Sequence, residues 1–337
     1  MSSTNMAVAK MRMGGRTAVG PSNGNWVPPM LATLSHSPFS RDGWLFEPKL
    51  DGVRCLASRS GNDVELLSRN QKRLNGKYPE LVDAFGEQPS DDLAVDGEIV
   101  TFDGAVTSFA RLQQRMQLER PSDEIRRKLP VWFYVFDVLR LNGKDTRQLP
   151  LRERRTLLAQ ALRFKDPLRL TEQRSTEGES YFREACQKGW EGIIAKDGES
   201  IYKSGRSADW LKFKCLNEQE FVIGGYTDPK GSRTGFGALL IGFYETGKLH
   251  YAGKVGTGYD TNTLQSLHAR LGKLRIKAPP FAGNDLPRRD VHWVTPKLVA
   301  QVAFGEWTRD GKLRQPRFLG LRSDKEAREV VREKANG

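Results

Sequence analysis

The sequence predicts an α+β fold class with two domains, a mixed domain of strands and helices followed by a small β-barrel. Three observations predict this organisation. The chain has 337 residues, which fits two domains more easily than one. Strand-like and helix-like patterns alternate up to Lys214, and short strands with glycine-rich turns dominate after it. Hydrophobic residues make up 38% of the chain, which is enough for a sizeable core and excludes a wholly disordered chain.

The first 25 residues differ from the rest. Residues 1–25 contain no acidic residue and three basic ones, Lys10, Arg12 and Arg16, among many Ser, Gly and Asn. This composition is typical of a disordered basic tail. A transit peptide is also rich in Arg and poor in acidic residues, but the amphipathic apolar stripe of such a peptide is missing. We therefore expect ordered structure to begin near Trp26.

The region from residue 26 to residue 217 predicts the mixed domain. Its short apolar runs are closed by turn residues, which is typical of strands. The expected strands are Trp44–Phe46, Val64–Leu67, Leu93–Val95, Ile99–Phe102 and Val131–Leu139. Helical patterns lie between them, and one begins directly after Pro150, where a helix can start. The expected helices are Ser108–Leu118, Leu151–Leu162 and Glu179–Gln187.

The region from residue 218 to residue 337 predicts the β-barrel, and we expect the domain boundary near Leu216–Gln219. The expected strands are Phe221–Tyr226, Ala238–Tyr244, Leu249–Val255 and Val291–Trp307. One helical stretch, Thr263–Leu274, interrupts them. About five short strands and one helix in about 110 residues indicate a small barrel of the OB-fold type.

The charge balance points to a polyanionic partner. The chain has 54 Lys and Arg against 41 Asp and Glu, a net charge of +13. Residues 219–337 hold 20 basic and 12 acidic residues, a net of +8, so this shorter part is the more basic one. A nucleic acid is the simplest partner for such a chain. No run approaches the ~20 apolar residues of a membrane span, which argues against a membrane partner.

Cysteines and histidines argue against two other kinds of site. The three cysteines, Cys55, Cys186 and Cys215, are far apart and odd in number, which argues against a disulfide framework and is typical of a reducing compartment. The four histidines are scattered, without the spacing of zinc ligands. Because the apolar run of a secretory signal is also missing near the start, we expect a cytoplasmic protein.

The segment Glu47–Arg54, with the sequence EPKLDGVR, holds the first candidate for chemistry. Lys49 follows a predicted strand and precedes a glycine turn. A lysine amine is mostly protonated at its ordinary pKa near 10.4, and it becomes a nucleophile when burial or nearby cations lower that pKa. By itself the segment also fits a surface turn, so its role depends on the rest of the sequence.

Further short motifs follow in order along the chain. They are Ser68–Asn70 (SRN), Asp96–Val100 (DGEIV), Phe133–Leu139 (FYVFDVL), Glu191–Lys196 (EGIIAK), Trp210–Lys214 (WLKFK) and Arg314–Lys325 (RQPRFLGLRSDK). From about Trp26 to Lys325 the series resembles the covalent nucleotidyltransferases, and within them the ATP-dependent DNA ligases. The resemblance is greatest to the ligase domain of bacterial ligase D, through Pro29–Ala32, Gly43–Lys49, Gly224–Tyr226, Gly235–Leu240 and Ala252–Gly258. It implies a nucleotidyltransferase (adenylation) domain over 26–217 and an OB-fold domain over 218–337.

The resemblance implies a reaction in three steps: adenylation of a lysine by ATP, transfer of AMP to a 5′-phosphate, and attack by a 3′-hydroxyl. Lys49 would be the nucleophile. Lys212 and Lys214 alternate on a predicted strand and so point to the same face. There they would neutralise the α-phosphate of ATP and, by their charge, depress the pKa of Lys49. Taken alone, these two lysines also fit the edge of a sheet, where lysines discourage aggregation.

The resemblance also implies ligands for the nucleotide and for a divalent metal ion. Glu191 would bind the metal, Mg²⁺ or Mn²⁺, and Glu98 would hold either the ribose or the metal. Glu47 would lie beside the edge of adenine, Phe136 would stack on its face, and Lys196 would contact a phosphate. An isolated glutamate is usually solvated and an aromatic residue in an apolar run usually belongs to a core, so each assignment depends on the whole series.

Arginines supply the remaining implied contacts. Arg54 and Arg69 would grip the ribose or the 5′-phosphate of the nick, because the planar guanidinium group bonds phosphate in a bidentate way. Arg206 would add a contact to DNA or nucleotide. Arg322 and Lys325 would orient the pyrophosphate leaving group, which they reach only when the second domain closes over the first. For each of these residues alone, a solvated surface position is the alternative.

The sequence therefore predicts an ATP-dependent DNA ligase that seals 3′-OH/5′-phosphate nicks in duplex DNA, in repair, recombination or non-homologous end joining. The implied cofactors are ATP and Mg²⁺ or Mn²⁺. The implied partners are nicked DNA and a Ku-type end-binding protein, and we expect a monomer in the bacterial cytoplasm, associated with the nucleoid. Two alternatives stay open: an RNA ligase of the same superfamily, and a nucleic-acid-binding module without catalysis.

Overall fold

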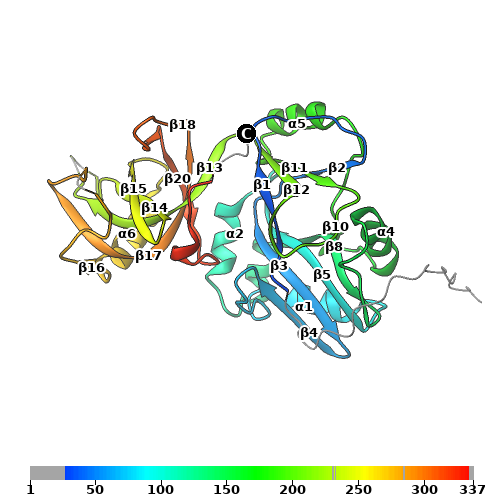
Figure 1. Cartoon of the computed structure of the whole chain (residues 1–337). Helices are drawn as coiled ribbons and strands as arrows, with labels where there is room; N and C mark the ends of the chain where they lie inside the picture. Colours follow the sequence, from blue (N-terminus) through cyan, green and yellow to red (C-terminus); the bar gives the residue numbers. More distant parts are fainter. Residues whose placement is uncertain (1–26, 230, 232, 284, 334–337) are drawn as a thin grey trace, which may run out of the picture.

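The structure is a computed structural model that describes residues 27–229, 231, 233–283 and 285–333. The basic tail expected over residues 1–25 lies outside the described residues. Figure 1 shows two lobes. The chain up to strand β12 (Gly205–Lys214) forms the first lobe, and the chain from strand β13 (Asn217–Thr227) onward forms the second.

A four-stranded sheet contains several sequence motifs of the first lobe. Its order is β1-β12-β11-β2, with β1 parallel to β12 and the other pairs antiparallel. The remaining strands of this sheet are β1 (Met30–Leu34), β2 (Trp44–Pro48) and β11 (Gly192–Asp197). Helix α5 (Gly178–Gln187) packs on it, and Tyr181 of the helix joins Phe46 and Phe213 of the sheet in one buried cluster.

A second sheet of the first lobe has the order β10-β8-β5-β3-β4, and β9 pairs with β8. Its strands are β3 (Val53–Ser60), β4 (Asp63–Ser68), β5 (Asp92–Val100), β8 (Trp132–Leu141), β9 (Lys144–Asp145) and β10 (Leu168–Leu170). The helices of this region are α1 (Pro79–Gly86), α2 (Phe109–Met116), α3 (Asp123–Lys128) and α4 (Leu151–Ala161), and a short hairpin consists of β6 (Phe102–Asp103) and β7 (Val106–Thr107). Apolar residues of α1, α2 and α4 share one core with the sheet, around Phe85, Leu112, Leu158 and Phe133.

The second lobe is a curved antiparallel sheet of order β15-β14-β13-β17-β16, with β20 paired to β17. Its further elements are β14 (Leu239–Glu245), β15 (Lys248–Val255), α6 (Thr261–Gly272), β16 (Arg275–Ile276), β17 (Val291–Phe304), β18 (Glu306–Trp307), β19 (Leu313–Arg314), β20 (Arg317–Leu321) and the 3₁₀ turn Ala327–Glu329. Asp260 caps α6 by accepting a hydrogen bond from Thr263 N–H at 2.6 Å. This arrangement confirms the predicted α+β class and the small barrel.

The expected strands and helices are present, with two kinds of difference. Helices α1 and α3 and strands β1, β3 and β10 were not predicted. The two strands expected on either side of Asp96 are a single strand, β5, because the segment between them is buried instead of forming a turn. Asp96 pairs with Arg54 at 2.5 Å, and a Cβ on Gly97 would lie 2.4 Å from the carbonyl oxygen of Tyr134.

The cysteines differ from expectation. Cys186 and Cys215 form a disulfide, and Cys55 is buried and free. The two paired residues are 29 positions apart in the sequence, and the packing of α5 on the first sheet brings their Cα atoms to 5.2 Å. One bridge does not make a disulfide framework, but it removes the pattern of free thiols from which we inferred a reducing compartment.

Among the described strands, no sheet contains strands of both lobes, and the change of sheet falls between Lys214 and Asn217. Within the described part of the chain, no helix is both long enough and apolar enough to cross a membrane.

Candidate active site

Lys49 is the first residue after β2, and close backbone contacts explain its motif. Its N–H donates to the carbonyl oxygen of Gly192 at 2.9 Å, which extends the pairing of β2 with β11. Gly192 has a φ of +149°, and a Cβ there would lie 1.9 Å from the carbonyl oxygen of Phe213. A Cβ on Gly52 would lie 2.2 Å from the carbonyl oxygen of Ile99. Both glycines therefore let the chain beside Lys49 approach neighbouring strands closely.

The Lys49 ammonium is paired with a carboxylate. Lys49 Nζ lies 2.5 Å from Glu191 Oε2, and both side chains are largely buried. Burial lowers the pKa of Lys49, but the negative charges of Glu191, Asp51 and Glu98 outweigh it, so the pKa is raised. Our expectation of a depressed pKa was wrong for this state of the cleft. The carboxylates, not the neighbouring lysines, dominate the field at Lys49.

Lys212 and Lys214 lie on β12 and face the same side, as their alternation predicted. Both contact the carboxylate of Glu333, with Lys212 Nζ 2.6 Å from Oε1 and Lys214 Nζ 3.1 Å from Oε2. Lys214 Nζ also donates to the carbonyl oxygen of Glu218 at 2.5 Å. Burial, followed by repulsion from Lys214, lowers the pKa of Lys212 to about 8. The charge effect expected at Lys49 therefore acts on Lys212.

Two carboxyl groups of the cleft have raised pKa values. Burial, reinforced by the charge of Glu191, raises the pKa of Asp51 to about 6. Burial also raises the pKa of Glu98 to about 7, although Arg54 opposes the shift. Asp51 in addition accepts a hydrogen bond from Phe109 N–H at the start of α2 (3.1 Å). A cation brought into the cleft would stabilise the ionised form of both groups.

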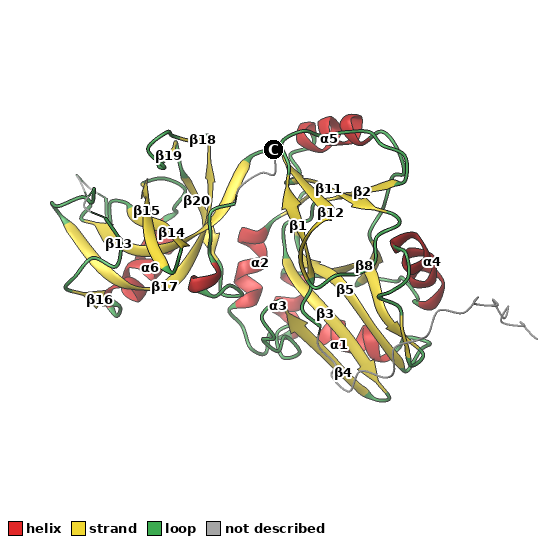
Figure 2. Cartoon of the chain, viewed as in Figure 1, coloured by secondary structure: helices red, strands yellow, loops and turns green. Residues whose placement is uncertain are grey.

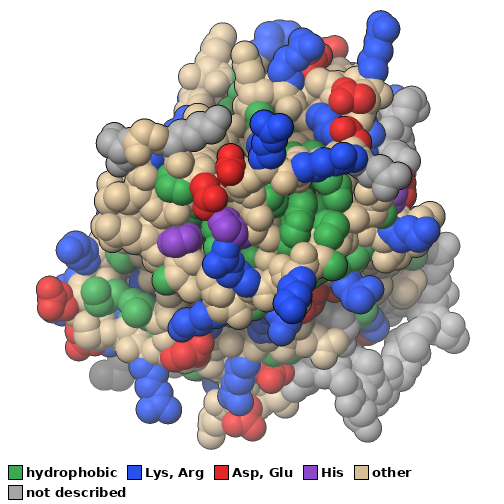
Figure 3. Space-filling view, turned by 90° about the vertical axis from the view of Figure 1, so that its left-hand side faces the viewer, with side chains coloured by type: hydrophobic (Ala, Val, Ile, Leu, Met, Phe, Trp, Pro, Cys, Tyr) green, Lys and Arg blue, Asp and Glu red, His purple; other side chains and the backbone are tan. Residues whose placement is uncertain are grey.

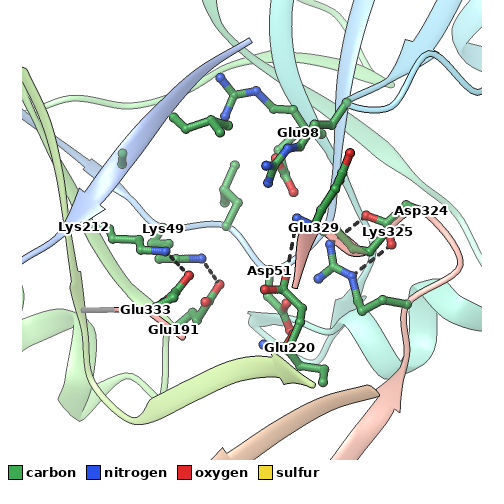
Figure 4. A pocket seen from close by; sticks show the side chains of 18 of the residues that line it. Lys49, Asp51, Glu98, Glu191, Lys212, Glu220, Asp324, Lys325, Glu329 and Glu333 are labelled. Atoms are coloured by element: carbon green, nitrogen blue, oxygen red, sulfur yellow. Dashed lines mark hydrogen bonds and ion pairs between the residues drawn. The ribbon is translucent and has the colours of Figure 1, made fainter. Parts of the chain in front are cut away.

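The second lobe contributes two basic residues to the same cleft. The Arg322 guanidinium pairs with Asp324 at 2.8 Å and lies 4.1 Å from the centre of the Phe109 ring. Lys325 Nζ lies 3.3 Å from Glu220. The charges of Lys325 and Arg322 outweigh burial and hold the pKa of Glu220 well below its usual range. Both basic residues line the same cleft as Lys49, so the structure has the two lobes closed. Figure 4 shows Lys49 and Lys325 in this cleft.

Three hydrogen bonds hold the segment 321–324 of the second lobe against the first, and we call them the closing contacts. They run from Asn70 Nδ2 to Asp324 O (3.1 Å), from Lys72 Nζ to Ser323 O (3.1 Å) and from Gln113 Nε2 to Leu321 O. Each donor is a side chain of the first lobe and each acceptor is a backbone carbonyl of the second. They therefore fix the backbone around Arg322 in the closed position.

The cleft between the lobes contains ten of the thirteen residues predicted for the site. Its basic residues are Lys49, Arg54, Arg69, Arg206, Lys212, Lys214, Arg322 and Lys325. Its acidic residues are Asp51, Glu98, Glu191, Glu220, Asp324, Glu326, Glu329 and Glu333. Eight basic and eight acidic side chains balance each other, so the cleft has no net charge when all are ionised.

Glu47, Lys196 and Phe136 do not line this cleft. Glu47 and Lys196 form a buried ion pair at 2.5 Å, and burial, opposed by Glu47, lowers the pKa of Lys196. Phe136 is covered by cations, with Lys196 Nζ 4.2 Å and the Arg54 guanidinium 4.5 Å from its ring centre. Glu47 Oε1 is buried and accepts no hydrogen bond from the described residues. Such an atom could accept one from a ligand amine.

The three predicted arginines of the first lobe differ in their contacts. Arg54 is held between the two sheets by Asp96, to which it is paired at 2.5 Å. Arg206 donates to the carbonyl oxygen of Ala32 at 2.8 Å and is otherwise exposed. Arg69 faces the cleft from the turn after β4. Arg69 and Arg206 are therefore accessible to a polyanion, whereas Arg54 already has its carboxylate partner.

Sequence reasoning missed six acidic residues of the cleft, which are Asp51, Glu220, Asp324, Glu326, Glu329 and Glu333. Asp51 and Asp324 belong to quoted motifs but received no role, although Asp324 pairs with Arg322 only two positions away. Glu220 and Glu333 received none because their partners, Lys325 and Lys212, lie far away in the sequence. Glu333 and Lys212 are 121 positions apart. The closure of the lobes brings Glu333 to Lys212, so no local pattern indicates this pair.

The carboxylates suit a metal that arrives with its substrate. Among the described residues, no group of three or more His, Cys, Asp or Glu is placed to hold a metal ion. Mg²⁺ commonly binds through one or two carboxylates, with substrate phosphates and water completing its octahedron. Glu191 and Glu98 both line the cleft beside Lys49. Their donor chemistry fits such an ion.

Comparisons with known proteins agree with this geometry. A family model described as "ATP dependent DNA ligase domain" matches residues 29–214, and one described as "ATP dependent DNA ligase C terminal region" matches residues 232–325. A structure entitled "mycobacterial DNA ligase D complexed with ATP and MES" superposes with a TM-score of 0.64 at 35% identity, covering 92% of this chain and 99% of that one. The fold is therefore a nucleotidyltransferase domain with a C-terminal OB-fold domain.

Two curated relatives are similar over most of the chain. The multifunctional non-homologous end joining protein LigD of Pseudomonas aeruginosa is 37% identical over 334 residues, covering 97% of this chain and 38% of the relative. The corresponding DNA repair protein of Mycobacterium tuberculosis is 38% identical over 312 residues, covering 90% of this chain and 40% of the relative. The chain thus spans about two fifths of the length of these relatives. It belongs to the family of ATP-dependent DNA ligases.

Proposed function

We propose that this chain seals 3′-OH/5′-phosphate nicks in duplex DNA through a lysyl-AMP intermediate on Lys49. The observation that supports this most is the convergence of Lys49, the lysine pair of β12 and the basic residues of segment 322–325 in one cleft. Lys49 must first lose a proton. Its nitrogen lone pair then forms a bond to the α-phosphorus of ATP, and the bond from that phosphorus to the bridging oxygen breaks, releasing pyrophosphate.

The lysines of β12 and the basic residues of the second lobe would contact different parts of the triphosphate. Lys212 and Lys214 would neutralise the α-phosphate, where charge increases during attack. Arg322 and Lys325 would orient the pyrophosphate from the opposite wall. Glu47 Oε1 accepts no hydrogen bond from the described residues, although it lies 3.7 Å from Arg155 Nη1, and it would accept one from the exocyclic amine of adenine. Phe136 and Lys196 would contribute to the base pocket once Arg54 turns toward the ribose.

Glu191 and Glu98 would hold a divalent cation, Mg²⁺ or Mn²⁺, together with the phosphates. Such an ion supplies positive charge to a cleft whose own charges cancel. Glu191 has a second role in this proposal, since its contact with Lys49 makes it a proton acceptor at the start of the reaction.

The later steps require the second lobe to withdraw, because DNA must reach the lysyl-AMP. The 5′-phosphate of the nick would then be gripped by Arg69 and Arg206, with Arg54 on the ribose. AMP passes to that phosphate as the P–N bond breaks. The 3′-hydroxyl next attacks the 5′-phosphorus, and AMP leaves as the phosphodiester bond forms.

We propose a role in DNA end joining, which is supported by the similarity to relatives that are named as end-joining proteins. We propose nicked DNA as the substrate, a Ku-type end-binding protein as partner, and a monomer acting at the bacterial nucleoid in the cytoplasm. Figure 3 shows one face of the second lobe, where Lys and Arg side chains are scattered around apolar ones. Such a surface suits the phosphate backbone without sequence preference.

We also propose that the domains meet between residues 217 and 218. The change of sheet between Lys214 and Asn217 supports this boundary. So does the end of the first matching family model at residue 214.

The test is transfer of label from α-labelled ATP to the protein in the presence of Mg²⁺ or Mn²⁺. We expect one acid-labile adduct on the wild-type chain and none on Lys49→Ala, because Lys49 supplies the nucleophilic amine in this proposal. An adduct that persists in Lys49→Ala would contradict the assignment. Lack of any adduct with either metal would favour the binding module without catalysis. Sealing of nicks with DNA or RNA on the 3′ side separates a DNA ligase from an RNA ligase.

A further inference from the structure

Glu333 occupies the space between the two lysines of β12. Each carboxylate oxygen faces one ammonium group, at 2.6 Å from Lys212 Nζ and 3.1 Å from Lys214 Nζ. Figure 4 shows the Glu333 side chain reaching Lys212 inside the cleft. Two oxygens on one centre, each on one lysine, reproduce the contacts that a phosphate group would make with this pair.

The segment that carries Glu333 is anchored to the second lobe. Its contacts are Tyr244 N–H to Val330 O (2.7 Å), Gln219 Nε2 to Val331 O (3.2 Å), Glu333 N–H to Gln219 Oε1 (2.9 Å) and the Arg332 guanidinium over the Trp307 ring (4.3 Å). All of these partners belong to the second lobe, whereas the two lysines belong to the first. The side chain of Glu333 therefore crosses between the lobes.

Glu333 is an anion at neutral pH. Burial raises its pKa, but the charges of Lys214 and Lys212 have the larger, opposite effect and lower the pKa to about 2. Its side chain is 15% exposed, and those of the lysines are 12% and 8% exposed. A phosphate placed on the same two ammonium groups would meet this carboxylate at contact distance and be repelled by it.

We propose that Glu333 is an internal competitor of the α-phosphate, so that ATP binding displaces Glu333 and releases segment 330–333. This inference rests on the proposed function, because it takes Lys212 and Lys214 as the seat of the α-phosphate. The segment then reports whether nucleotide is bound. With Glu333 docked, its carboxylate offsets one of the two lysine charges and occupies the place of the α-phosphate. With ATP bound, the segment loses its contact with the first lobe and is held only by its contacts with the second.

The first experiment measures ATP affinity by calorimetry in a Lys49→Ala background, where no adenylation can occur. We expect Glu333→Gln to bind ATP about tenfold more tightly, as follows if the free form is populated to about one tenth. Glu333→Asp keeps the charge but shortens the side chain, so we expect an affinity between wild type and Glu333→Gln. Glu306→Gln, which removes an equal charge from an exposed ion pair with Arg314, is the matched control. We expect no change in it.

The aspartate variant separates competition for contacts from a general effect of charge. The competition does not exist if two results occur together. Glu333→Asp would have the ATP affinity of the wild type, and Glu333→Gln would have the same ATP affinity as Glu306→Gln. Equal affinities of wild type and Glu333→Gln also overturn the proposal.

The second experiment follows amide hydrogen exchange in the Lys49→Ala chain with and without ATP. Loss of the lysine contacts removes one anchor of the segment that pairs with Tyr244 N–H and carries Glu333 N–H, so these hydrogen bonds open more often and we expect both amides to exchange faster with ATP. Unchanged or slower exchange on ATP binding would overturn the proposal. If wild type forms no lysyl-AMP, the proposed function fails, while the affinities and exchange rates still decide whether nucleotide displaces Glu333. If ATP binds to no variant, both fail.

Discussion

At the scale of single residues, the cleft keeps carboxyl groups where burial opposes their charge. Asp51 is the clearest case, because its pKa is raised from 3.8 to about 6 by burial and by Glu191. The folded chain therefore holds the proton of Asp51 more tightly than the unfolded chain. Protonated Asp51 therefore stabilises the fold at low pH. This stabilisation is lost progressively as pH rises from about 4 through 6, since the unfolded state releases the proton first.

Asp51→Asn should therefore stabilise the fold at pH 8 but not at pH 4. Asparagine retains an oxygen for the hydrogen bond from Phe109 N–H and carries no charge at any pH. We expect an increase in the free energy of unfolding of roughly 1–2 kcal/mol at pH 8, measured by denaturant titration with a metal chelator present. An equal effect at both pH values would show that the charge of Asp51 is not the cause.

At the scale of elements, the end of β20 and the turn after β4 determine whether the second lobe is closed. The closing contacts fix the backbone on both sides of Arg322, although none involves its side chain. In the proposed reaction, the closed state is needed for adenylation and hinders access of DNA. Changes at this junction should therefore affect the steps unequally.

Arg322→Ala should slow formation of lysyl-AMP by about 10²–10³-fold, the effect of removing a group that stabilises developing charge. Gln113→Ala, which removes one closing contact, should slow it about fivefold, as expected for ~1 kcal/mol. Single-turnover labelling with ATP measures both rates. Sealing of a pre-adenylated nick is the control, and we expect it to change less than twofold. Equal losses in both assays would contradict a role limited to the closed state.

At the scale of the whole molecule, the chain can be predicted in outline because each motif has a local physical requirement. Gly52 and Gly192 are needed for close backbone approach, and alternation on β12 places Lys212 and Lys214 on one face. The field at Lys49 could not be predicted, because it depends on carboxylates from separate elements. Glu333 was missed for the same reason.

The short helices and the disulfide escaped prediction for related reasons. Helix α3, Asp123–Lys128, has no buried residue, so it leaves no hydrophobic period in the sequence. The pairing of Cys186 with Cys215 results from the packing of α5 against the sheet that contains β12. Neither feature is encoded by spacing alone.

The excess charge of the second lobe should make nick binding depend strongly on salt. Residues 219–337 have a net charge of +8, and each phosphate that they neutralise releases counter-ions. For about six phosphate contacts, affinity should fall about 10³-fold between 50 and 200 mM salt. A binding titration on a nicked duplex at several salt concentrations measures the slope. An affinity that stays within a few-fold would place the basic surface away from DNA.

The electrical neutrality of the cleft has a consequence for the order of events. Eight basic residues and eight acidic ones line it, so the net charge of +13 for the whole chain comes from residues outside the cleft when all of its groups are ionised. A long polyanion is attracted to the basic residues outside the cleft, and it gains no electrostatic attraction from entering the closed cleft. A nucleotide, in contrast, brings its own counter-ion. Its phosphate would replace the carboxylate of Glu333 on Lys212 and Lys214. In the proposed reaction, the nucleotide therefore binds first, and DNA enters the cleft only after the lobes separate.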